Sequence, residues 1–156
     1  LMKRFTYWPQ LFLGITFNYG LILGWTSINE NISLAPIILY IGAIFWTLGY
    51  DTIYGFQDIK DDEIIGLKST SIKFKKNPHK FLVICYSIFI TSILITGVLM
   101  NFDYLFFILL IIPFLHLLIN QINKLQANNP KICLDIFRSN NALGFIIFIN
   151  ILIGKL

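Results

Sequence analysis

Long apolar segments alternate with polar ones along this chain of 156 residues. A membrane-spanning helix needs roughly 20 mostly apolar residues, so the pattern predicts about five such helices. They are placed at about 8–28, 34–56, 81–100, 104–122 and 140–156. The last is short, so its start is assigned to Phe137, Asn140 or Asn141. We therefore predict an all-α fold, a polytopic transmembrane helix bundle.

Local sequence signals mark two of the helix starts. Ser33 is a typical N-cap residue, and Pro36 fits the first turn that follows it. Asn77-Pro78 ends a polar connection at 57–77 and predicts a new helix. A second polar connection is expected at 123–139.

Composition supports the membrane interpretation. Hydrophobic residues make up 56% of the chain, charged residues 13%, and the mean hydropathy is +0.74. Soluble domains carry about 25% charged residues, so a soluble globular protein is excluded. The start of the chain lacks the pattern of a secretory signal peptide. The two cysteines, Cys85 and Cys133, have no metal-binding or disulfide spacing, and we interpret them as free thiols.

The basic residues test the predicted topology. Eleven of the twelve lie at the start of the chain, in the two long polar connections or beside them. If the chain crosses the membrane five times, all of these segments lie on the same side. Only Lys155 falls on the other side. Because Lys and Arg are enriched in cytoplasmic loops, this side should face the cytoplasm, or the matrix of a mitochondrion. Topology thus explains the basic charge, and we expect no nucleic-acid partner.

The strongest candidate for chemistry is an acidic cluster at the end of the second predicted span. Four acids fall within 58–63, and Asp51 lies one to two turns earlier in the apolar segment. A carboxylate inside a hydrocarbon layer costs about 2.5–3.5 kcal/mol at the bilayer centre and less near the interface. An acid in this position therefore indicates binding, although a solvated helix end at the membrane surface is the simpler interpretation of such a cluster.

Helical geometry selects three of these acids. On one continuous helix, Asp51, Asp58 and Asp62 lie at about 0°, 340° and 20° and form a narrow stripe, with Tyr54 beside it. Asp58 and Asp62 are one turn apart, close enough to chelate one cation. Asp51 lies about 10 Å further along the axis. It therefore contacts a second metal ion or the substrate, or else the helix breaks near Gly55.

Oxygen ligands alone favour Mg²⁺ over softer metals. Because Mg²⁺ usually combines one or two carboxylates with phosphate oxygens, the cluster predicts a diphosphate partner. Nearby lysines could neutralise the remaining charge of that diphosphate; they are Lys60, Lys68 and Lys73.

Three segments together resemble the UbiA family of intramembrane prenyltransferases. Tyr50-Asp51-x-x-Tyr54-x-x-x-Asp58-x-x-x-Asp62, followed by Gly66-x-Lys68-Ser69-Thr70, is similar to the family's second aspartate-rich motif. The opening Lys3-Arg4-Phe5-Thr6-Tyr7-Trp8-Pro9-Gln10 resembles the stretch before helix five of members that act on 4-hydroxybenzoate. Asn140-Asn141-x-x-Gly144 resembles the entry to the last helix.

The resemblance implies a nine-helix fold in which the predicted spans are helices 5–9. The family's first aspartate-rich motif is not found in this sequence, and the chain opens on a basic, loop-like stretch. We therefore expect residues 1–156 to be the C-terminal part of a single transmembrane prenyltransferase domain. Half of the metal site would then come from the missing part, and residues 1–156 alone should be inactive.

The resemblance also implies a reaction: Mg²⁺-dependent transfer of a polyprenyl group from polyprenyl diphosphate to the ring of 4-hydroxybenzoate, a step of ubiquinone biosynthesis. The protein would be integral to a bacterial cytoplasmic membrane or a mitochondrial inner membrane. Two alternatives stay open. A sibling prenyltransferase with another acceptor would share the aspartates, and a non-catalytic transport or assembly protein would not need them.

Individual residues receive roles on this basis. Asp58 and Asp62 are assigned to the metal–diphosphate site, and Asp51 to the metal or to the reacting carbon. Substrate-binding roles are assigned to Arg4, Lys68, Tyr54 and Asn18. Lys3 is expected to act only as a basic anchor at the membrane surface.

Overall fold

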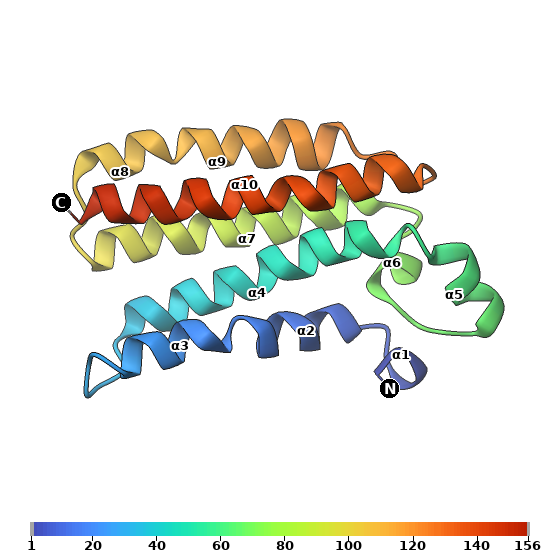
Figure 1. The fold of residues 1–156 in the computed structure, drawn as a ribbon, viewed down its shortest axis with the longest axis horizontal. Helices are drawn as coiled ribbons and strands as arrows, with labels where there is room; N and C mark the ends of the chain where they lie inside the picture. Colours follow the sequence, from blue (N-terminus) through green and yellow to red (C-terminus); the bar gives the residue numbers. More distant parts are fainter. Residues whose placement is uncertain (1, 156) are drawn as a thin grey trace.

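The computed structural model describes residues 2–155, and they form a helical bundle without a strand in that range. The long helices run side by side, while three short helices (Met2–Phe5, Ile59–Ile65 and Thr70–Lys73) gather at the end that also holds the N-terminus (Figure 1). The helices are α1 (Met2–Phe5), α2 (Pro9–Phe17), α3 (Tyr19–Thr26), α4 (Leu34–Gly55), α5 (Ile59–Ile65), α6 (Thr70–Lys73), α7 (Pro78–Leu99), α8 (Tyr104–Leu109), α9 (Ile111–His116), the π-helix η1 (Leu117–Asn123) and α10 (Pro130–Gly154).

Four segments are long and apolar enough to cross a membrane: Leu34–Gly55, Pro78–Leu99, Tyr104–Asn123 and Pro130–Gly154. The predicted polytopic, all-α class is therefore confirmed. Ser33 precedes α4 and Asn77 precedes α7, so both predicted helix starts are also confirmed.

The first predicted span, a continuous helix over 8–28, is wrong, because the chain divides it at Asn18 into α2 and α3. The Asn18 amide Nδ2 lies 2.8 Å from Gly14 O, 3.3 Å from Ala43 O and 2.8 Å from Thr47 Oγ1. The side chain thus fastens the α2–α3 junction to α4. Such amide bonds between helices are typical of membrane proteins.

We expect Asn18→Ala to destabilise the protein by about 1 kcal/mol, since it removes these donors from an interhelical contact. Thermal unfolding in detergent would measure the change. Asn29→Ala is the matched control, because the Asn29 amide donates only to Trp25 O in an exposed turn. Equal melting temperatures for the two variants would contradict a role for Asn18 at the junction.

The last helix begins earlier than predicted. It starts at Pro130, with the Asn129 side chain accepting a hydrogen bond from Ile132 N, so the assigned starts at Phe137, Asn140 or Asn141 are wrong. The charged side chains that suggested a loop lie on the exposed face of the first turns; they are Lys131, Asp135 and Arg138. Of the polar connection predicted at 123–139, only the short segment between η1 and α10 remains outside a helix.

The core is built from α4, α7, α8, η1 and α10, and within it α4 and α7 pack closely. A Cβ added at Gly42 would lie 2.5 Å from Ser92 Cβ, and one at Gly49 would lie 2.5 Å from the Tyr86 ring, so glycine permits this approach. Cys85 is 1% exposed and Cys133 is 0% exposed, and both are free thiols inside the core.

Candidate metal and substrate site at the loop end of the bundle

The acidic cluster does not continue α4. That helix ends at Gly55, so the stripe of three acids on one continuous helix is wrong, and the alternative of a break near Gly55 is what the structure contains. Asp51 stays in α4, half buried, whereas Asp58 occupies the N-cap position of α5. Asp58 and Asp62 remain one helical turn apart, because Asp62 N donates to Asp58 O at 2.9 Å.

Gly66 ends α5 and turns the chain back toward the bundle. Its φ of +76° lies in the left-handed region, where glycine is favoured because it lacks a Cβ. Its backbone N–H donates to Glu63 O, and the next N–H, of Leu67, donates to Asp62 O at 2.8 Å. This turn leads the chain into the Ser69–Thr70 segment that packs on α4.

Asp62 is buried and carries an ion pair. Its Oδ2 atom accepts a 2.8 Å hydrogen bond from Lys3 Nζ, and the side chain of Asp62 is only 8% exposed. The backbone N–H of Lys68 donates to Lys3 O at 2.7 Å. Lys3 is therefore more than the membrane anchor that we expected, since it joins the start of the chain to the acidic loop.

A buried polar network holds the loop against the bundle. Thr70 N donates to Gln10 Oε1 at 3.1 Å, and the hydroxyls of Thr70 and Thr52 lie 2.6 Å apart. Ser71 Oγ donates to Thr52 O at 2.8 Å. Because buried polar groups cost free energy unless they are paired, this network fixes how the loop lies on α2 and α4.

The sequence patterns did not predict these structural roles. Gln10 and Thr70 appear only as parts of motifs, and Thr52 and Ser71 were assigned no role. The one sequence signal for this buried network is that hydroxyl and amide residues cluster at the edges of apolar segments.

The predicted substrate-binding residues fall in two places. Arg4 and Lys68 lie at the loop end, where Arg4 is exposed and Lys68 Nζ lies 5.7 Å from the centre of the Tyr7 ring. Tyr54 lies on α4 with its ring centre 4.7 Å from that of Phe137 on α10. Asn18 lies deeper, at the α2–α3 junction.

A cavity of about 380 Å³ opens between the α2–α3 junction, α4 and α10. Asn18 lines it, and so do Tyr50 and Phe137, whose ring centres lie 5.7 Å apart. The Trp46 ring stacks on Phe89, and its Nε1 donates to Asn140 Oδ1 at 2.9 Å. These two contacts hold Trp46 in place in the wall of the cavity. The cavity therefore combines aromatic faces with a few amide groups.

In the described part of the chain, Asp58 and Asp62 are not part of a complete metal cage. No group of three or more His, Cys, Asp or Glu side chains comes close enough to hold an ion within residues 2–155. Asp58 makes no capping hydrogen bond, and Asp62 pairs with Lys3 through Oδ2. Two oxygen ligands one turn apart suit Mg²⁺, which takes its other ligands from water and substrate phosphates.

Comparison with known proteins identifies the class of this membrane protein. The model of the UbiA prenyltransferase family matches residues 1–151, so the chain belongs to that family. It is 41% identical to the mitochondrial 4-hydroxybenzoate polyprenyltransferase of Bos taurus, 40% identical to that of Homo sapiens and 37% identical to that of Aedes aegypti. These alignments cover 100% of this chain but 42%, 42% and 35% of the relatives, so it spans less than half of their length. No solved structure matches significantly.

Proposed function

We propose that this chain is the C-terminal part of a polyprenyltransferase that transfers a polyprenyl group to 4-hydroxybenzoate. The observation that carries the proposal is the 36–41% identity, along essentially the whole chain, to proteins named for that activity. Asp58 and Asp62 support it, because they supply the two carboxylates of a diphosphate-bound Mg²⁺ site. The remaining ligands would come from a first aspartate motif outside these 156 residues.

Different residues of this chain would have different roles in the proposed reaction. Asp58 and Asp62 would hold Mg²⁺, which when bound neutralises the diphosphate leaving group. Lys68 and Arg4 would add positive charge to the same group, and Asp51 would orient the substrate from the end of α4. The allylic carbon–oxygen bond then breaks, the ring carbon ortho to the hydroxyl of 4-hydroxybenzoate bonds to the allylic carbon, and that ring carbon loses its proton.

The cavity beside Tyr54 suits the cationic half of this reaction. The rings of Tyr50 and Phe137 line or border it, and an aromatic face stabilises a nearby cation by about 0.5–2 kcal/mol. Asn18 contributes an amide for the polar end of an acceptor. The surrounding apolar helices keep out water, which would otherwise trap the cation as an alcohol.

The proposed setting is a mitochondrial inner membrane or a bacterial cytoplasmic membrane, with the acidic loop on the matrix or cytoplasmic side. The location of eleven of the twelve basic residues supports this orientation. The word mitochondrial in the relatives' names favours the first of the two membranes.

Metal removal tests the proposal directly. Membranes that hold the full-length protein, given labelled 4-hydroxybenzoate and a polyprenyl diphosphate, should form prenylated product with Mg²⁺ and lose it with EDTA. Restoring Mg²⁺ should restore the product, because the leaving group depends on the ion. Product formation that survives EDTA would contradict the metal site, and prenylation of only another aromatic acceptor would contradict the choice of substrate.

A further inference from the structure

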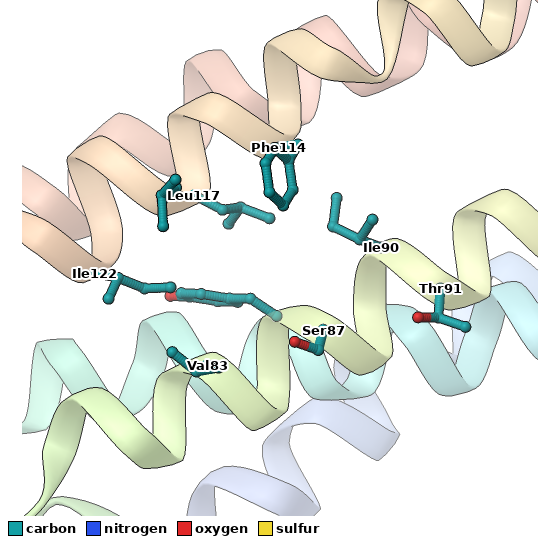
Figure 2. A pocket seen from close by; sticks show the side chains of 9 residues that line it. Val83, Ser87, Ile90, Thr91, Phe114, Leu117 and Ile122 are labelled. Carbon is teal, nitrogen blue, oxygen red and sulfur yellow. The ribbon is translucent and has the colours of Figure 1, made fainter.

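A second groove lies away from the acidic loop, between α7 and the segment formed by α9 and η1. It has a volume of about 400 Å³ and mostly apolar walls. Val83, Ser87 and Ile90 of α7 face Phe114, Leu117 and Ile122 across it (Figure 2). Val83 and Ile122 lie at one end of the groove, and Thr91 lies toward the other (Figure 2). The groove therefore runs along two antiparallel membrane helices.

The wall opposite α7 includes an unusual backbone. The π-helix η1 contains Leu117, Leu118 and Ile122, which all line the groove. A π-helix is rare and usually a single turn, and such segments are frequent at functional sites. Here it extends over seven residues. An α-helix would present a different set of side chains to α7, so η1 shapes this groove.

Two lysines lie close in the chain to Val83 and Ile122, the residues at one end of the groove. Lys80 precedes Val83 by one turn of α7, and Lys124 follows Ile122 by two residues at the end of η1. Both lysines are exposed. The ion pairs found within residues 2–155 use Lys3 and Lys75 instead, so these two charges stay uncompensated. They belong to the basic side of the predicted topology.

The shape of the groove limits what can enter it. The nine residues from Val83 to Thr91 span about 12 Å along α7, close to the roughly 15 Å hydrocarbon depth of one leaflet. A protein helix, about 10–12 Å across with its side chains, occupies roughly 1,000 Å³ over this length, well above the groove volume of about 400 Å³. An extended hydrocarbon chain fits the space and the apolar walls.

We propose that this groove binds one acyl chain of an anionic phospholipid, whose phosphate contacts Lys80 and Lys124. Basic residues between transmembrane helices on the cytoplasmic or matrix side attract anionic lipid head groups, and each lysine near the surface raises affinity by about fivefold. The apolar walls select a lipid over a free phosphate ion. This binding site is independent of the proposed prenyl transfer.

Photo-labelling of the full-length protein in phosphatidylcholine vesicles tests the site. The probe is a phosphatidylglycerol with a diazirine in one acyl chain, compared with a phosphatidylcholine probe that carries the same chain. Peptides that cover 83–91 and 114–122 should be labelled by the anionic probe at a lower concentration than by the phosphatidylcholine probe. Half-saturation should rise about fivefold in Lys80→Gln or Lys124→Gln and about 25-fold in the double variant.

Two further variants separate the charge from the groove. Lys131→Gln is the matched control, since Lys131 is exposed on α10, a helix that contributes no residue to the groove; it should leave labelling unchanged. Ser87→Trp should fill the groove and abolish labelling even with both lysines present. Equal labelling by the two probes, displacement of the lipid by millimolar inorganic phosphate, or a double variant that behaves like Lys131→Gln would each overturn the proposal.

Discussion

Asp58→Asn and Asp62→Asn should each lower kcat for prenyl transfer by about 100-fold or more in the full-length protein. An amide keeps the size of the side chain but removes the charge that holds a metal ion against the diphosphate, and losing one such electrostatic contact costs about 10²–10³ in rate. The measurement is the rate of prenylated product formation at saturating Mg²⁺. The variant that carries both substitutions should be inactive, and raising the Mg²⁺ concentration should not restore its activity.

Two controls separate this effect from loss of structure. Asp61→Asn changes an exposed carboxylate in the same turn of α5 and should keep most of the activity. Lys3→Gln removes the ion pair to Asp62 but keeps the carboxylate, so its rate loss should be smaller than that of Asp62→Asn. If Asp61→Asn were as damaging as Asp58→Asn, or Lys3→Gln as damaging as Asp62→Asn, the assignment of the metal ligands would be wrong.

Gly55→Ala should destabilise the protein by about 1–3 kcal/mol, the usual cost of forcing extra volume into a packed site. A Cβ at Gly55 would lie 2.3 Å from Ser71 Oγ and 3.4 Å from Gln10 Nε2. The clash would push the loop off α4 and disturb the bonds that Ser71 and Thr70 make with Thr52 and Gln10. Thermal unfolding of the purified protein measures the loss.

Gly24→Ala is the matched control, because a Cβ there meets nothing within 4 Å. It should be neutral or slightly stabilising, since alanine favours a helix by about 0.5–1 kcal/mol. Adding Ser71→Ala should partly rescue Gly55→Ala, because the nearest remaining atom is Ser71 Cβ at 3.3 Å. A double-mutant cycle quantifies the coupling, and strict additivity would show that the two residues do not meet.

Local signals made part of the fold predictable. The starts of α4 and α7 directly follow Ser33 and Asn77, and Pro78 occupies the first turn of α7, although neither Ser33 nor Asn77 makes a capping hydrogen bond through its side chain. The start of α10 was missed for the opposite reason. Charged side chains suggested a loop, although spaced along an amphipathic helix they all reach the exposed face. At the break between α2 and α3, Asn18 bonds to Thr47 and Ala43 of another helix, and no local sequence pattern predicts such a contact.

The site was predictable in composition but not in arrangement. The acids and their spacing identify Asp58 and Asp62 as a pair, whereas the end of α4 at Gly55 decides that Asp51 does not lie on the same helix. The partners of the loop lie far along the chain: Lys3 is 59 residues from Asp62, and Gln10 is 60 residues from Thr70. Hydrophobic periodicity carries no information about such pairings, because they form only when separate helices pack together.

The burial of Cys85 and Cys133 gives the protein an intrinsic reporter of its own integrity. Neither sulfur offers a surface to a maleimide dye while the bundle stays closed. One reports on the interior of α7, and the other on the first turns of α10, at the loop end of the bundle. The fluorescence of such a dye therefore follows the opening of these two regions without any engineered label.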